Sequence, residues 1–135
     1  MIVFVDTSAV VALLSRADEH HTDALAVWGT LLADRARLVT TDLVLAEAVT
    51  VVRARAGFQV SVQAGERLLA EPFDLQLADR ALVDEAWRLY RRYRDHHLSL
   101  CDCVSFAVMH RRRIHAAFAY DADSDAIGFT RVRAG

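Results

Sequence analysis

Residues 2–14, IVFVDTSAVVALL, join two apolar runs through three polar residues. Ile2–Val5 is short and rich in β-branched residues, which is typical of a buried strand. The polar residues 6–8 are all types that cap helices, and the apolar run 9–14 follows them directly. The stretch therefore predicts a strand that leads straight into a helix, with Asp6 at the junction.

The same alternation of short apolar runs and helical patterns continues along the chain. Further strands are expected at Leu38–Thr40, Phe73–Leu77, Ala116–Ala119 and, at an edge, Phe129–Val132. Helices are expected around 25–32, at Leu43–Ala56 with Thr41 or Asp42 as cap, at Phe58–Ala70, from Asp79 to Tyr93, and from Ser99 to about Arg112. This order predicts a three-layer α/β/α fold with a central, mainly parallel sheet. With 135 residues and no linker or repeat, we expect one domain, residues 1–135.

Composition excludes several classes of protein. Hydrophobic residues make up 54% and charged residues 25%, as in a globular chain rather than a disordered one. All 16 basic residues are arginines, so enzymes that depend on a lysine, such as P-loop NTPases and Schiff-base enzymes, are excluded. The two cysteines are too few for a disulfide framework, and no apolar run approaches a membrane span. We expect a cytoplasmic protein with no membrane association.

Four carboxylates stand where acids are unusual. Asp6 and Asp121 follow predicted strands, and ligands of open α/β sheets bind beyond the carboxyl ends of the strands. Glu47 and Asp102 lie in helices whose residues three and four positions away are not basic. Each acid also has an ordinary interpretation: Asp6 as a helix cap, Asp102 as part of a capping box with Ser99, Asp121 as a turn residue and Glu47 as the partner of a distant arginine.

One hypothesis explains all four acids together. If they converge at one edge of the sheet, their mutual repulsion requires a divalent cation, and a site made of oxygen atoms suits Mg²⁺, with Mn²⁺ as the alternative. Such a cation polarises phosphodiesters and activates water, which is nuclease chemistry.

Four stretches carry a resemblance to a known family. They are Val3–Ala9 (VFVDTSA), Thr41–Ala48 (TDLVLAEA), Leu98–Cys103 (LSLCDC) and Phe118–Asp121 (FAYD). Their order and spacing resemble the PIN-domain ribonucleases, most closely the VapC toxins of bacterial toxin–antitoxin pairs. The resemblance implies a PIN-like fold in which Asp6, Glu47, Asp102 and Asp121 are catalytic residues and metal ligands. It also implies an auxiliary role for Ser8 and for Asp123, with Asp123 and Asp125 left open as alternatives to Asp121.

The function that the resemblance implies is a metal-dependent endoribonuclease. We expect it to cut RNA, to be restrained by a cognate VapB-like antitoxin and to form a homodimer. The alternative is a non-catalytic PIN-like module that binds RNA or protein. Four intact acids favour the enzyme, because a binding module has no need of a repulsive cluster.

Other features have more than one interpretation. The basic clusters at 91–94 and 111–113 are either solvated helix ends or contacts for RNA phosphates or an acidic partner. Trp28 and Trp87 lie in apolar helical patterns and are expected in the core or at dimer contacts rather than as base-stacking platforms. Cys101 and Cys103 are two positions apart on a helix, so they point to different sides and are expected to fill small spaces rather than bind zinc.

Overall fold

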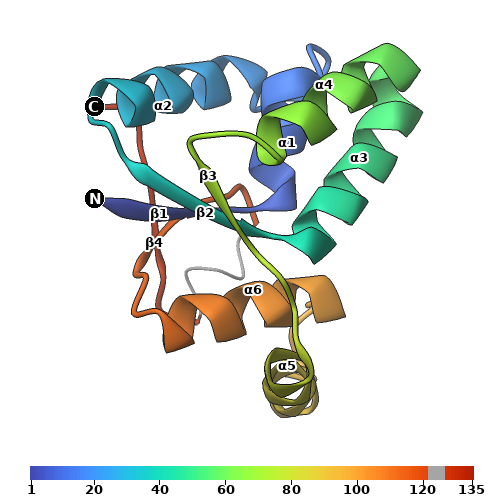
Figure 1. Ribbon diagram of the computed structural model, residues 1–135, viewed down its shortest axis with the longest axis vertical. Helices are drawn as coiled ribbons and strands as arrows, with labels where there is room; N and C mark the ends of the chain where they lie inside the picture. The colour runs from blue at the N-terminus through green and yellow to red at the C-terminus, as the bar shows by residue number, and fades with distance from the viewer. Residues whose placement is uncertain (122–126) are drawn as a thin grey trace.

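A computed structural model describes residues 1–121 and 127–135, and its centre is a parallel sheet (Figure 1). Within these residues the strands are β1 (Ile2–Val5), β2 (Arg37–Thr41), β3 (Phe73–Gln76), β4 (Ala116–Phe118) and β5 (Thr130–Arg131). Their order across the sheet is β3-β2-β1-β4-β5, and every neighbouring pair is parallel. The predicted edge strand at the C-terminal end is confirmed as β5. The first strand of the chain thus lies at the centre of the sheet.

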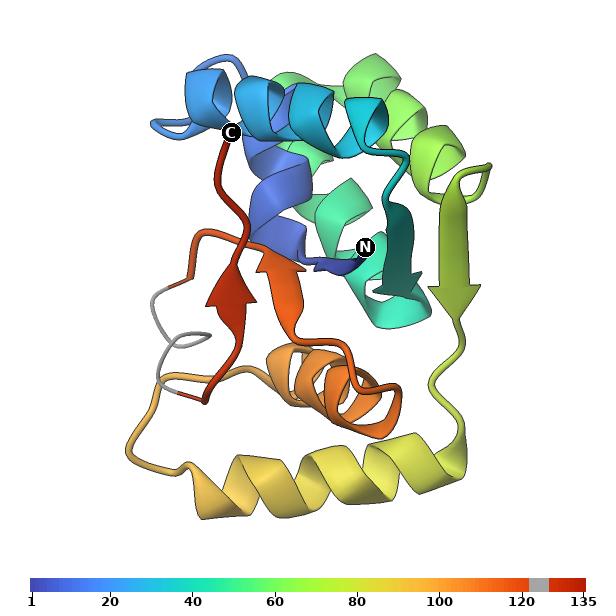
Figure 2. The ribbon, with the colours of Figure 1, turned by 90° about the vertical axis from the view of Figure 1, so that its left-hand side faces the viewer.

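Helices cover both faces of the sheet. They are α1 (Thr7–Leu14), α2 (His21–Ala33), α3 (Asp42–Ala56), α4 (Phe58–Leu68), α5 (Arg80–Arg92) and α6 (Leu100–Arg111). Helices α1 to α4 lie on one side, while α6 covers the other side and α5 packs outside α6 (Figures 1 and 2). The three-layer α/β/α prediction is confirmed.

Alternation along β1 explains the two cores. Val3 and Val5 pack with residues of α1 to α4, whereas Phe4 points to the opposite face and packs with residues of α6. Both faces of β1 are therefore buried, as expected for a central parallel strand that is apolar at successive positions.

Local signals explain where several elements begin and end. Of the two predicted caps for α3, Thr41 is the one used: its hydroxyl oxygen accepts the Val44 N–H at 3.1 Å. Gly57, at a φ of 93°, ends α3 and starts α4 in a backbone conformation that side chains disfavour. The fourth strand is shorter than predicted and stops at Phe118, because the Tyr120 N–H donates to the Ser8 hydroxyl instead of a strand. Likewise β3 ends at Gln76 and leaves Leu77 63% exposed.

Within the described residues, no helix is both long and apolar enough to cross a membrane.

Candidate metal centre

Asp6 lies at the junction of β1 and α1, where the sequence places it. Its backbone N–H donates to the Phe118 carbonyl at 3.0 Å, which ties the ends of β1 and β4 together. Its side chain caps α1, and its Oδ2 accepts the Ser8 hydroxyl at 2.9 Å. The residue is only 8% exposed. A buried carboxylate at the carboxyl edge of a parallel sheet is in the position where such folds bind ligands.

Asp102 reaches the same place from the opposite side of the sheet. It lies in the first turn of α6 and forms the predicted capping box: its backbone N–H donates to the Ser99 hydroxyl at 3.0 Å, and its Oδ2 accepts the Ser99 backbone N–H at 2.9 Å. The box fixes the carboxylate at the start of the helix. The ordinary interpretation of Asp102 is therefore correct and does not compete with a role in the site.

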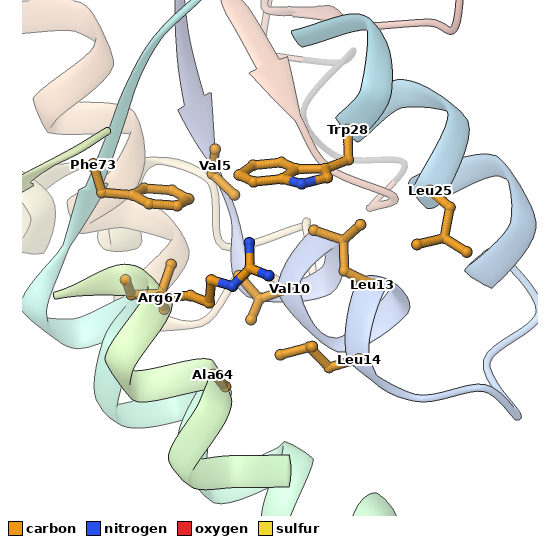
Figure 3. A pocket seen from close by; sticks show the side chains of 10 residues that line it. Val5, Val10, Leu13, Leu14, Leu25, Trp28, Ala64, Arg67 and Phe73 are labelled. Carbon is orange, nitrogen blue, oxygen red and sulfur yellow. The ribbon is translucent and has the colours of Figure 1, made fainter. Parts of the chain in front are cut away.

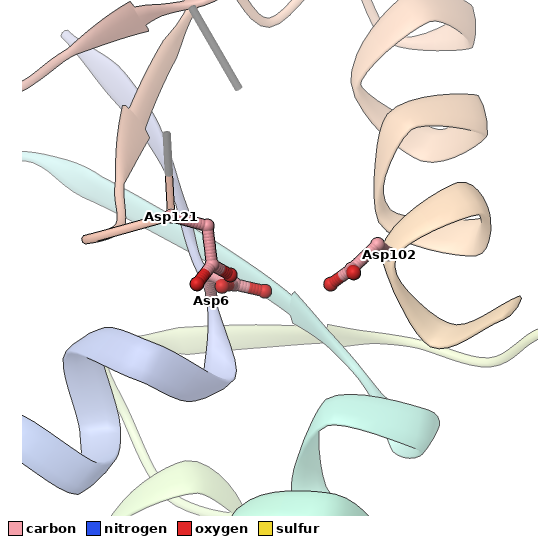
Figure 4. Close-up of side chains that lie close together, drawn as sticks. All are labelled: Asp6, Asp102 and Asp121. Atoms are coloured by element: carbon pink, nitrogen blue, oxygen red, sulfur yellow. The ribbon is translucent and has the colours of Figure 1, made fainter. Parts of the chain in front are cut away.

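Asp121 completes the group from the segment after β4. Oxygen atoms of Asp6, Asp102 and Asp121 all lie within 4.8 Å of one another (Figure 4). Asp121 itself is exposed, and its carbonyl oxygen accepts a hydrogen bond from Arg131 at 3.2 Å. Three carboxylates from three separate elements thus meet at the end of β1. We refer to Asp6, Asp102 and Asp121 as the acidic trio.

The crowding of negative charge alters protonation. Burial, and then the charges of Asp121 and Asp102, raise the pKa of Asp6 from 3.8 to about 7. Burial is also the main reason that the pKa of Asp102 is raised, opposed by the hydrogen bonds to Ser99 and reinforced by the charge of Asp121. Without a cation, the acidic trio is therefore unfavourable in its fully charged form.

Glu47 lies near the acidic trio but outside its 4.8 Å group. Its negative charge contributes to the raised pKa values of Cys101 and Asp102, which shows that it is close to α6. It borders a groove together with Ser8 and Asp121 and is half-buried. No ion pair joins Glu47 to an arginine anywhere in residues 1–121 and 127–135, so a distant arginine does not explain this acid.

Ser8 supports the centre from the first turn of α1, and Thr7 precedes it in the same turn. The Ser8 hydroxyl donates to Asp6 and accepts the Tyr120 N–H, both at 2.9 Å, so it links the strand ends that carry Asp6 and Asp121. Sequence reasoning did not single out Thr7. Its hydroxyl is buried beside Cys101 and has no well-formed hydrogen bond within the described residues. The only signal for Thr7 in the sequence was its position between Asp6 and Ser8.

The remaining sequence predictions have mixed outcomes. Asp123 and Asp125 fall outside the described residues. Cys103 is fully buried while Cys101 is partly exposed, as their spacing predicted. Trp28 packs on the core and stacks with Phe73, but Trp87 is 51% exposed, so the expectation of a core position is wrong for Trp87. The helix that contains Trp87 was predicted correctly, but its hydrophobic pattern does not show whether Trp87 faces the core or the solvent.

A second cavity is apolar and separate from the acids. It has a volume of about 170 Å³ and lies among α1, α2, α4 and β3 (Figure 3). Trp28 and Phe73 stack across it, and Arg67 is its charged lining residue. None of the four candidate acids borders it.

Comparison with known proteins agrees with this geometry. The sequence model of the PIN domain matches residues 3–130. The chain belongs to the PIN-domain family. It is also 32% identical over 131 residues to the 23S rRNA-specific endonuclease VapC20 of two Mycobacterium tuberculosis strains, covering 97% of this chain and 98% of VapC20. This PIN-domain protein is therefore a member of the VapC ribonuclease toxins, as the four sequence stretches predicted.

Solved structures show the same fold. The crystal structure of M. tuberculosis VapC20, described as a toxin that cleaves the sarcin–ricin loop, superposes with a TM-score of 0.88 at 32% identity, over 97% of this chain and 98% of the other. VapBC2 from Rickettsia felis, solved with a DNA fragment from its promoter, matches with a TM-score of 0.69 at 12% identity, over 97% of both chains. The second match supports the fold alone.

Proposed function

We propose that residues 1–135 act as a single nuclease domain that hydrolyses RNA phosphodiester bonds with the help of Mg²⁺ or Mn²⁺. The observation that carries this proposal is the acidic trio, whose carboxylate oxygens lie within 4.8 Å of one another. Like charges gathered so closely are unfavourable unless a cation neutralises them. A folded chain gains nothing from this arrangement unless it serves a ligand.

The donor set fits a hard divalent cation. The acidic trio offers only carboxylate oxygens, which are the ligands that Mg²⁺ and Mn²⁺ prefer. Asp6, Asp102 and Asp121 are the proposed ligands, and Glu47 is proposed to act from the edge of the site. Asp123 remains a proposed auxiliary acid.

The chain's own groups prepare the site for hydrolysis. A bound cation would supply polarisation of the phosphodiester and a lower pKa for its water. Ser8 holds the Asp6 carboxylate through a 2.9 Å hydrogen bond, and the capping box holds Asp102. Glu47 borders the groove next to Asp121 and has no ion-pair partner in the described residues, so it is available to accept a proton from the attacking water.

The partners follow from the family. We propose RNA as the substrate, with the 23S rRNA named for VapC20 as the first target to test, and therefore action in the cytoplasm. We also propose a VapB-like antitoxin that restrains the enzyme, with a tail inserted near the acids, and a homodimer. Light scattering that gives a monomer mass at high concentration would remove the dimer.

The decisive experiment is sequencing of RNA 5′ ends after induced expression of wild type and of Asp6→Asn. We expect new, discrete 5′ ends with wild type and none with the variant. Equal RNA ends in both strains would support the alternative, a non-catalytic PIN-like module that binds RNA or protein. Asparagine keeps an oxygen that caps α1, so loss of folding does not explain a negative result.

A further inference from the structure

The charges of this protein are unevenly distributed. Residues 80–113 contain 8 of the 16 arginines but only 4 of the 18 acidic residues, although the whole chain has a net charge of −2. These residues form α5, α6 and their connections, which make up one face of the molecule (Figure 2). A polyanion such as RNA is therefore attracted to the α5–α6 side of an otherwise acidic protein.

The outer surface of α5 also carries two aromatic side chains. Leu82 and Ala86 are buried against the rest of the protein. Trp87 and Tyr90 of the same helix are 51% and 43% exposed, and their rings stack with centroids 5.5 Å apart and planes within 14°. An exposed pair of nearly parallel rings is a surface on which an unpaired base stacks.

Arginines surround this aromatic pair. Arg88 and Arg91 are exposed, and neither makes an ion pair with any described residue. Arg91 lies one helical turn after Trp87, so both project from the same side of α5. Arg80, about two turns before Trp87, pairs with Asp84 at 2.9 Å. Stacking rings beside uncommitted guanidinium groups match the bases and phosphates of single-stranded RNA.

The α5 surface is connected to the acidic trio by a short segment. The chain leaves α5 at Arg92 and enters α6 at Leu100, two residues before Asp102. In this connection Leu98 packs with Ala86 of α5 and also lines the small cavity bordered by all three acids. This connection places the C-terminal end of α5 close to the end of the sheet where the acids meet.

We propose that Trp87, Tyr90, Arg88 and Arg91 form a binding surface for an unpaired stretch of the RNA substrate. The proposal rests on the proposed function, because it assigns the substrate's flanking nucleotides to this surface. A second copy of the chain fits less well: a two-fold contact centred on Trp87 would bring Arg88 and Arg91 of both copies together, and like charges repel.

Binding to a labelled RNA tests the proposal directly. In the Asp6→Asn background, which we expect not to cut, fluorescence anisotropy compares a fluorescein-labelled RNA hairpin with an unpaired loop and the blunt duplex of its stem. Trp87→Ala should weaken hairpin binding about tenfold and leave duplex binding nearly unchanged, because paired bases cannot stack on the rings. Trp87→Phe should restore most of the affinity. Arg91→Ala should weaken both and lower the slope of log affinity against log salt by about one.

Phe58 provides the matched control. It is 55% exposed on α4, with the Arg53 guanidinium 5.1 Å from its ring, so it presents an aromatic and arginine pair on the other layer of the protein. Phe58→Ala should not change hairpin binding. The proposal is overturned if Trp87→Ala binds the hairpin as tightly as its parent, if Phe58→Ala loses as much, or if Trp87→Ala alters the oligomer mass and weakens hairpin and duplex equally.

Cleavage assays separate this proposal from the proposed function. With an otherwise wild-type chain, Trp87→Ala should reduce cleavage of the hairpin at low RNA concentration and approach wild-type cleavage at saturation. Equal cleavage by both proteins at low RNA concentration overturns the α5 surface and leaves the nuclease intact. Absence of cleavage by wild type with Mg²⁺ and Mn²⁺ contradicts the nuclease, while hairpin binding still decides the α5 surface.

Discussion

Asp6 and Asp79 have the same local role and very different surroundings. Each is the residue before a helix, and each carboxylate accepts a backbone N–H of the first turn, from Ser8 in α1 and from Leu82 in α5. Asp79 caps α5, which packs outside α6, and it does not belong to the acidic trio. Asp6 lies within 4.8 Å of two others, and its pKa rises to about 7.

The difference separates an acid that only caps a helix from one that also belongs to the proposed metal site. A capping aspartate stabilises its helix at little cost while it is solvated. Asp6 and Asp102 cap their helices too, but tertiary packing brings them together with Asp121 and adds a repulsion that capping does not require. Capping therefore explains why aspartate is acceptable at positions 6 and 102, whereas the convergence with Asp121 is the basis of the metal site proposed for them.

Removal of one charge from the site should have the largest effect. Asp6→Asn, Asp102→Asn, Asp121→Asn and Glu47→Gln should each lower RNA cleavage by roughly 100-fold or more, since even the supporting residues of metal sites contribute 10- to 100-fold. Steady-state cleavage of labelled RNA measures the loss. Asp79→Asn is the matched control and should cut like wild type. Activity retained by Glu47→Gln would remove Glu47 from the site.

Ser8→Ala should have a smaller effect on cleavage. It loses the hydrogen bond to Asp6 and the one from Tyr120, so the carboxylate remains but is less firmly placed. We expect about a tenfold loss of activity, partly recovered at high Mg²⁺. Ser8→Thr keeps the hydroxyl and should retain more activity; if both variants lose activity equally, the hydroxyl is not what matters.

The pH dependence of stability should reveal the raised pKa of Asp6. The folded pKa of Asp6 is raised to about 7 from 3.8, so between these values the folded, metal-free protein holds a proton that the unfolded chain has released. Its free energy of unfolding should therefore fall by about 2–4 kcal/mol as the pH rises from about 4 to about 7. Urea titrations with EDTA measure this fall. Asp6→Asn should flatten the curve, and a curve of unchanged slope would show that Asp6 does not hold this proton.

A bound divalent cation should neutralise the repulsion between the carboxylates of the acidic trio. At a Mg²⁺ or Mn²⁺ concentration tenfold above Kd, the folded state should gain about 1.4 kcal/mol, with a higher Tm. Differential scanning calorimetry at pH 7.5 measures the gain. Asp79→Asn should respond like wild type and Asp102→Asn should respond less. An equal response of Asp102→Asn would place the bound cation elsewhere.

The smallest effect concerns the isolated cap. Asp79→Ala should destabilise the protein by about 1 kcal/mol because the Leu82 N–H loses its acceptor, and cleavage by the folded protein should be unchanged. Urea unfolding together with the cleavage assay tests both parts. A loss of cleavage in folded Asp79→Ala would show that α5 affects the site through its position.

Much of the fold could be predicted from the sequence because its signals are local. The strand at 2–5, the caps at Thr41 and Asp79 and the capping box at Ser99 all depend on residues within a few positions. The ends of β3 and β4 were less predictable, because they depend on contacts from elsewhere in the chain. Tyr120, for example, leaves the strand direction to donate to Ser8, which precedes it by 112 positions.

The candidate acids could likewise be predicted from the sequence, but the distances between them could not. Position in the pattern identified Asp6, Glu47, Asp102 and Asp121, since each stands at a strand end or among apolar helical neighbours. The sequence did not indicate that Glu47 stays outside the group formed by the other three. The expected core position of Trp87 was also wrong, because hydrophobic periodicity alone does not reveal that α5 carries two exposed aromatic rings. The alternative for Trp87, a dimer contact, stays a prediction.

Local patterns in the sequence predict the alternation of strands and helices, the acids at their junctions and the family of the protein. These properties follow from side-chain periodicity and from capping, which act over one or two turns of chain. Which acids meet depends on tertiary packing, because β1, β4 and α6 are far apart along the chain and their approach is set by the packing of both cores. The raised pKa of Asp6 follows from that approach, since burial and repulsion between charges depend on distance in space and not on separation along the sequence.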